Sequence, residues 1–113
     1  MEEKCAPCGS AAKALSAEEA TKRLAALPDW KLAQDGRRIE KRFKFRDFMG
    51  ALDFVNRVSA LAETEGHHPD ICFGWGYCYV AFQTHKISGL SENDFKMANK
   101  VDAVLASPAV SAT

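Results

Sequence analysis

The sequence lacks the long apolar run that a membrane-spanning helix needs, since no apolar stretch approaches about 18 residues. It also lacks an excess of charge of either sign: lysine plus arginine, and aspartate plus glutamate, number 15 each. A dominant nucleic-acid or anionic-membrane partner would need a basic excess. The N-terminal Met1-Glu2-Glu3-Lys4 is acidic and has no apolar segment of a signal peptide. We therefore expect a cytoplasmic protein that binds neither nucleic acid nor membrane.

The chain has four cysteines, which could in principle form a disulfide framework. Without an export signal, we expect reduced thiols rather than disulfides. Cys72 and Cys78 lie in apolar, strand-like runs, where free cysteine packs as a small hydrophobe. Cys5 and Cys8 form a single CxxC, and no second CxxC supplies the two further ligands of a structural zinc site. An unstructured leader is the favoured interpretation, with a redox pair or half of a metal site as alternatives.

The length of 113 residues suits one domain. Hydrophobic residues make up 47% and charged residues 27%, an ordinary globular profile. We predict a flexible leader over 1–14, a domain over 15–107 and a tail over 108–113. A domain of this size gains stability from association.

Local signals predict the first half of the domain. Ser16 and Glu19 form a capping box for a helix over 16–27, which Pro28 ends. A strand near Trp30 follows, then an Asp35-Gly36 turn and a return strand over 38–45. The return strand alternates apolar and charged residues, except at Lys41, which is typical of an antiparallel sheet with one covered face.

A second helix should begin after Asp47 and end near Gly66. Its expected buried stripe consists of Phe48, Ala51, Leu52, Val55, Val58, Leu61 and Ala62. Residues 70–84 indicate a hairpin that turns around Gly74-Trp75-Gly76, with Cys78, Val80 and Phe82 as the apolar set of its second strand. A third helix should open at Ser91, in a capping-box variant with Asp94, and stop before Pro108.

The element order is therefore helix, strand, strand, helix, strand, strand, helix. Hairpin-linked strands make the sheet at least partly antiparallel, and three amphipathic helices should cover one of its faces. This pattern predicts an α+β fold. The other face would carry tyrosines and mixed charge.

The three histidines of the chain are candidates for one functional site. His67 and His68 follow the predicted helix end, and hairpin pairing would bring His85 roughly opposite residues 65–69. Imidazole has an unperturbed pKa of about 6.5, so it can donate or accept a proton near neutrality. We expect Glu63 and the three histidines to converge in one pocket. Neighbouring extended residues point in opposite directions, so this convergence needs a bend at Gly66.

Plainer roles exist for each of these residues. A single histidine near a strand end is usually a polar cap, and Glu63 could be a solvated helix residue. Asp94 fits a helix cap better than direct chemistry. Trp30 and Trp75 fit core positions better than ligand platforms. Zinc could use three histidines and a carboxylate, but adjacent histidines are awkward ligands and no HExxH is present, so we expect no metal.

The spacing of these residues resembles the signature of the pterin-4a-carbinolamine dehydratases. The matching positions are Glu63, His67-His68-Pro69, Trp75, His85 and Asp94. The resemblance covers about residues 15–106 and includes Leu27-Pro28-Asp29-Trp30, Phe43-Lys44-Phe45-Arg46-Asp47-Phe48 and Thr84-His85.

The resemblance implies a four-stranded antiparallel sheet with three helices on one side. It implies dehydration of 4a-hydroxytetrahydropterin to quinonoid dihydropterin, the recycling step after an aromatic amino-acid hydroxylase, with no metal or organic cofactor. His67 and His85 would be the acid and base, His68 would bind the ring, and Glu63 would orient a histidine. Asp94 and Trp75 would have supporting or substrate-binding roles.

The resemblance also implies a homodimer or homotetramer. Two alternative functions come from the same family or from pterin chemistry. One is a dimerisation cofactor of a homeodomain transcription factor, and the other is a pterin-binding protein in molybdopterin metabolism.

Overall fold

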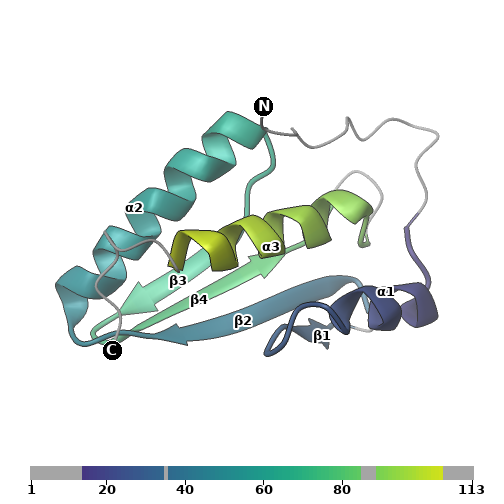
Figure 1. Ribbon diagram of the computed structural model, residues 1–113, viewed down its shortest axis with the longest axis horizontal. Coiled ribbons are helices and arrows are strands. Elements are labelled where there is room, and N and C mark those ends of the chain that lie inside the picture. The colour runs from purple at the N-terminus through teal and green to yellow at the C-terminus, as the bar shows by residue number, and fades with distance from the viewer. Residues whose placement is uncertain (1–13, 35, 85–88, 106–113) are drawn as a thin grey trace.

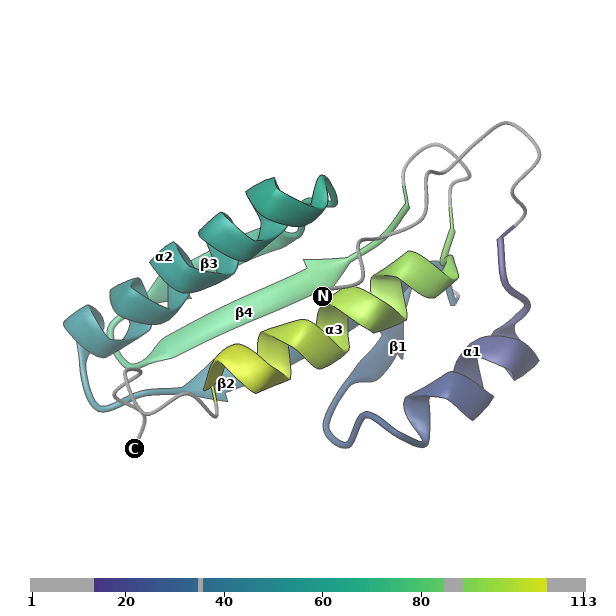
Figure 2. The ribbon, with the colours of Figure 1, turned by 45° about the horizontal axis from the view of Figure 1, so that its top comes forward.

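A computed structural model describes residues 14–34, 36–84 and 89–105 (Figure 1). Its elements, in chain order, are α1 (Ala17–Leu24), β1 (Lys31–Ala33), β2 (Arg38–Lys44), α2 (Phe48–Glu65), β3 (Asp70–Gly74), β4 (Tyr77–Phe82) and α3 (Glu92–Leu105). The strands form one antiparallel sheet in the order β1-β2-β4-β3. The helices lie on one face of this sheet (Figures 1 and 2). The predicted α+β class and element order are confirmed.

The β3–β4 hairpin is tight. Gly74 pairs with Tyr77, so the turn consists of Trp75 and Gly76 alone. Gly76 has a φ of 81°, a left-handed conformation that glycine adopts without steric cost. The pairing continues to Asp70 opposite Ala81. The hairpin therefore places Trp75 at one end of the sheet and the start of β3, next to the histidine pair, at the other.

Helix α1 is shorter than predicted. Ser16 and Glu19 form the expected capping box, with Glu19 N–H donating to Ser16 Oγ at 3.1 Å. The prediction of a helix to residue 27 was wrong because the chain tightens after Leu24. The amides of Ala25, Ala26 and Leu27 donate to carbonyls three residues back, which is 3₁₀-type bonding at a helix end.

Helix α2 has the predicted ends but a rotated buried face. Asp47 caps it by accepting from Gly50 N–H at 2.9 Å, and Gly66 ends it. Phe54, which the predicted stripe omitted, is fully buried against Phe43 and Phe45, with ring centroids 4.7 and 5.1 Å away. Phe48, placed in that stripe, is 43% exposed. The helix is apolar over so wide an arc that its hydrophobic period alone does not locate the centre of the contact.

The core lies between the sheet and the helices. Its strand residues are Ile39, Phe43, Cys78, Val80 and Phe82, and Phe45, directly after β2, joins them. Lys41 shares their face, and its ammonium lies 2.9 Å from Asp102 Oδ1 of α3. Asp102 Oδ2 also accepts from Trp30 Nε1–H at 3.1 Å, and Trp30 is buried as predicted. Lys41, which interrupts the apolar alternation of β2, therefore forms an ion pair that links the sheet to α3.

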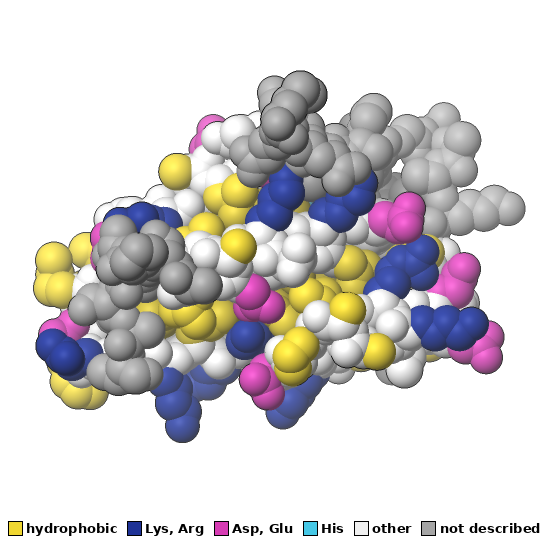
Figure 3. Space-filling view, in the orientation of Figure 1, with side chains coloured by type: hydrophobic (Ala, Val, Ile, Leu, Met, Phe, Trp, Pro, Cys, Tyr) yellow, Lys and Arg dark blue, Asp and Glu magenta, His cyan; other side chains and the backbone are white. Residues whose placement is uncertain are grey.

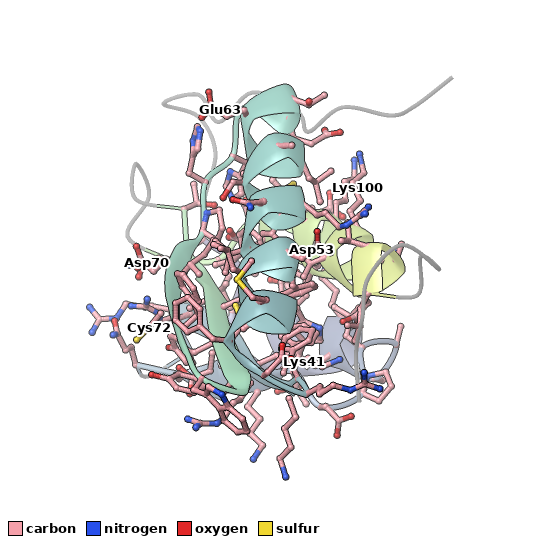
Figure 4. The ribbon with its side chains drawn as sticks, turned by 90° about the vertical axis from the view of Figure 1, so that its left-hand side faces the viewer. Lys41, Asp53, Glu63, Asp70, Cys72 and Lys100 are labelled. Atoms are coloured by element: carbon pink, nitrogen blue, oxygen red, sulfur yellow. The ribbon has the colours of Figure 1, made fainter. Side chains whose placement is uncertain are left out.

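The opposite face of the sheet carries the predicted tyrosines and mixed charge. Tyr79 donates to Glu40 Oε1 at 2.6 Å, and burial together with this hydrogen bond raises the pKa of Tyr79. The Arg42 guanidinium lies 4.4 Å from the Tyr77 ring centroid. Cys72 is exposed on this side (Figure 4), so the expectation that Cys72 packs as a small hydrophobe was wrong. The same expectation holds for Cys78, which is fully buried. Neighbouring strand residues point to opposite faces of the sheet, and an apolar run does not show which of the two faces the helices cover.

Within the described ranges, no helix is long and apolar enough to cross a membrane. Residues 1–13 of the predicted leader, with Cys5 and Cys8, and the predicted tail from residue 108 lie outside the described residues.

Candidate active site

The end of α2 fixes the position of His67. Gly66 adopts the left-handed conformation, with φ 71° and ψ 25°. The amides of Gly66 and His67 both donate to Ala62 O, at 2.9 and 3.3 Å. This arrangement satisfies a carbonyl at the helix end and turns the chain sharply towards β3. His67 therefore leaves the helix with its backbone already hydrogen-bonded.

The His67 side chain points into the protein. Its Nε2 lies 2.6 Å from Oδ1 of Asp94, a residue of the first turn of α3. The two side chains are 12% and 0% exposed. The imidazole also lies nearly parallel to the Phe82 ring, with centroids 6.0 Å apart. The end of α2, the end of β4 and the start of α3 thus meet at this histidine.

The second oxygen of Asp94 has its own partners. Oδ2 accepts from Thr84 Oγ1 at 2.8 Å and from Ser91 N–H at 2.9 Å. The Thr84 and Ser91 hydroxyl oxygens lie 2.8 Å apart. Asp94 therefore caps α3, as its spacing from Ser91 predicts, and contacts a histidine with the same carboxylate.

His68 points to a different partner. Its Nε2 lies 2.5 Å from Oε2 of Glu63, which Figure 4 shows near the end of α2. These two side chains are 59% and 76% exposed. Glu63 therefore contacts a histidine, but Asp94 is the partner of His67. Adjacent extended residues diverge, and the described residues form two separate pairs rather than one four-residue cluster.

His85 lies outside the described residues, so its convergence with the other two histidines stays a prediction. The residue before it, Thr84, is described and touches Asp94. The Thr84 amide donates to Gly89 O at 2.8 Å, so the chain on both sides of residues 85–88 is joined beside the His67–Asp94 pair.

Trp75, the remaining predicted site residue, is not close to His67 within one chain. It is 72% exposed at the β3–β4 turn. The five-residue strand β3 separates it from the histidine pair, which amounts to a distance of about 16 Å or more. The expectation that Trp75 is a core residue was wrong, because turn residues at a hairpin tip have no layer above them.

Two polar features near the site were missed from the sequence. Thr84 is buried and its hydroxyl contacts Asp94. It lies two residues past the end of β4 and continues the alternation of Cys78, Val80 and Phe82, which is the signal that could have found it. Glu65, in the last turn of α2, has a fully buried side chain whose Oε2 lies 2.8 Å from Lys100 Nζ. No local pattern links these two residues, because they are 35 positions apart.

The site is thus a buried histidine–carboxylate pair beside an exposed one, at the edge of an antiparallel sheet covered by helices. Within residues 14–34, 36–84 and 89–105, no three histidine, cysteine or acidic side chains gather closely enough to hold a metal ion. These features define an α+β protein that holds one histidine beside a buried carboxylate and a second histidine beside an exposed one.

Comparisons with known proteins identify the family. The family model "Pterin 4 alpha carbinolamine dehydratase" matches residues 13–104, and the chain belongs to this family. A protein of Methylococcus capsulatus named "Putative pterin-4-alpha-carbinolamine dehydratase" is 54% identical over 102 residues, 90% of each chain. A protein of the same name from Rubrobacter xylanophilus is 48% identical over 101 residues, 89% of this chain and 94% of its own.

Two solved structures resemble the fold. A transcriptional coactivator/pterin dehydratase from Brucella melitensis has a TM-score of 0.77 and 33% identity, over 81% of this chain and 98% of its own. A pterin dehydratase-like protein described as a RuBisCO assembly factor in the alpha-carboxysome has a TM-score of 0.62 and 27% identity, over 72% and 94%. The resemblance to the dehydratase signature is therefore confirmed at the level of the family.

Proposed function

We propose that this protein is a dehydratase that converts 4a-hydroxytetrahydropterin to quinonoid dihydropterin and water. Membership of the dehydratase family supports the substrate class. The observation that carries the proposal is the His67–Asp94 pair, an imidazole held 2.6 Å from a fully buried carboxylate at the position of the family signature.

The reaction needs two proton transfers and no change of oxidation state. An acid protonates the 4a-hydroxyl group, and the C4a–O bond breaks to release water. The N5 lone pair forms the C4a=N5 double bond, and a base removes the N5 proton. One group that gives a proton and one that takes a proton are sufficient, and each typically contributes about 10²–10⁴-fold.

We assign the acid and base roles to His67 and His85. Asp94 places a carboxylate oxygen 2.6 Å from His67 Nε2 and so orients the imidazole ring. His68, which is largely exposed, would bind and orient the pterin ring, and Glu63 would orient His68 through the contact between their side chains. Trp75 would have a substrate-binding role only if a second copy brought it to the histidines.

The proposal places the protein in the cytoplasm as a homodimer or homotetramer. There it would recycle the tetrahydropterin cofactor of an aromatic amino-acid hydroxylase. The hydroxylase forms the unstable 4a-hydroxy compound, so a dehydratase must act on it soon after release.

The test is a stopped-flow assay in which 4a-hydroxytetrahydropterin is generated and its loss is followed by absorbance. The protein should accelerate the loss above the spontaneous rate in proportion to its concentration. His67→Ala should lose at least roughly tenfold in turnover while keeping the circular dichroism spectrum of the parent. A rate equal to the spontaneous one, with folded protein, would remove the proposal.

A second candidate function is protein interaction. Phe48 and Met49, at the start of α2, are 43% and 66% exposed, and hydrophobic side chains are visible at this end of the molecule in Figure 3. The titles of the two similar structures name a transcriptional coactivator and an assembly factor. A partner retained in a pull-down after substitution of all three histidines, but lost in Met49→Glu, would support this role. A role in molybdopterin metabolism would show as pterin binding without dehydration.

A further inference from the structure

We propose that Asp94, Thr84 and the backbone amide of Ser91 together hold His67 in the tautomer that carries its proton on Nε2. The nitrogen left to exchange a proton with substrate is then Nδ1. The part of this inference that concerns substrate rests on the proposed dehydratase function, whereas the tautomer itself does not. Thr84 is a positioning residue, because it touches Asp94 and acts on His67 only through it.

The argument begins with the donors around Asp94 Oδ2. The Ser91 backbone N–H, at 2.9 Å, can only donate. The Thr84 hydroxyl lies 2.8 Å from the same oxygen. Two donors on one oxygen fix the plane of the carboxylate and direct Oδ1 towards His67.

The next step concerns the atom that faces Oδ1. An ionised carboxylate only accepts hydrogen bonds, so His67 Nε2, at 2.6 Å, must donate. A neutral imidazole has a single N–H, and a hydrogen on Nε2 leaves the lone pair on Nδ1. His67 is therefore prepared as a base through Nδ1. Once it accepts a proton there, Asp94 stabilises the imidazolium, as a buried aspartate does in the serine protease triad.

Burial makes this arrangement persistent. Asp94 is fully buried, so water does not compete for its oxygens. The ring of His67 is confined by the parallel Phe82 ring, 6.0 Å away. Thr84 is itself held, with its amide bonded to Gly89 O and its hydroxyl 2.8 Å from Ser91 Oγ.

Asp94→Asn gives the sharpest test. The Ser91 N–H remains, so the asparagine must place its carbonyl oxygen in the Oδ2 position and its NH₂ group towards His67. Nε2 then has to accept, and the proton moves to Nδ1. We expect turnover to fall at least roughly a hundredfold with KM nearly unchanged, by analogy with the aspartate-to-asparagine change in that triad.

The tautomer can be read directly. In protein labelled with ¹⁵N-histidine, the long-range ¹H–¹⁵N spectrum distinguishes protonated from unprotonated ring nitrogens, and only three histidines contribute. His67→Ala assigns the signals. We expect Nε2–H at His67 in the parent protein and Nδ1–H in Asp94→Asn. An Nδ1–H tautomer in the parent would overturn the inference, whether or not the protein proves to be a dehydratase.

Thr84→Val and Thr84→Ser test the positioning role. Valine removes the hydroxyl at nearly constant shape, and we expect roughly tenfold lower turnover together with mixed His67 tautomers. Serine keeps the hydroxyl and should recover both the spectrum and most of the turnover. Equal behaviour of the two variants would refute the role of Thr84. If Thr84→Val does not fold, the spectra of the parent and of Asp94→Asn still decide the tautomer.

Discussion

Asp94 Oδ1 lies 2.6 Å from His67 Nε2, although the two residues are 27 positions apart in the chain. His68, the neighbour of His67, pairs instead with the exposed Glu63. The two adjacent histidines therefore occupy different environments, and substitutions should affect them unequally.

Replacing the buried His67 should lower turnover more than replacing the exposed His68. His67→Ala and His85→Ala should each lower turnover at least roughly tenfold, because each removes an acid or base of the proposed reaction. His68→Ala should act mainly on KM, because its side chain lies at the surface. Steady-state kinetics of the three variants make the comparison, and equal effects on turnover at positions 67 and 68 would contradict the division of roles.

Gly66→Ala should destabilise the protein by about 1 kcal/mol. The φ of 71° is a left-handed conformation that costs a residue with a Cβ about 1–2 kcal/mol. A Cβ at this position would meet no atom within 4 Å, so the effect should come from the backbone alone. Urea unfolding measures this loss of stability. Gly66→Asn should lower the free energy of unfolding less than Gly66→Ala, because asparagine tolerates the left-handed conformation. Equal stability of Gly66→Ala and the parent would count against the cap described at His67.

Asp102→Ala should destabilise the protein by roughly 2 kcal/mol, because the Lys41 ammonium and the Trp30 indole N–H lose their shared acceptor. The matched control is Asp53→Ala, which removes a partly exposed i,i+4 pair with Arg57. The control should change the free energy of unfolding by less than about 0.5 kcal/mol. Similar losses in both variants would show that the Asp102 bridge contributes no more than a surface pair.

Stability should fall in alkaline solution through Cys78. Burial raises the pKa of Cys78 to about 12, while a thiol in the unfolded chain titrates near 8.5. The unfolded state therefore loses its proton first, and the stability present below about pH 8.5 is lost as pH rises towards 12. Tyr79, whose pKa is also raised, acts in the same direction.

Urea unfolding between pH 7 and 10.5 measures this slope, which for one thiol reaches at most about 1.4 kcal/mol per pH unit. Cys78→Ala should have a shallower slope, and Cys72→Ala should change the slope less, because Cys72 is exposed and is the smaller cause of the raised Cys78 pKa. An unchanged slope in Cys78→Ala would contradict the burial argument.

Both ends of α2 were predictable because each has a local chemical signal, Asp47 as the acceptor for the first amides and Gly66 as the left-handed residue. The burial of Phe54 was not, because several apolar residues compete for one broad helix face. The partner of His67 could not be predicted from the sequence either. The spacing of Ser91 and Asp94 indicates a helix cap. Only the packing of α3 against the end of α2 shows that the same carboxylate contacts a histidine.

The central claim is best tested by the single-turnover rate constant for loss of 4a-hydroxytetrahydropterin, measured with excess protein for the parent and for His67→Ala side by side. We predict a parent rate constant well above the spontaneous one and a drop of at least roughly tenfold in the variant. Equal rate constants for the two folded proteins would contradict the assignment of His67 as a catalytic residue.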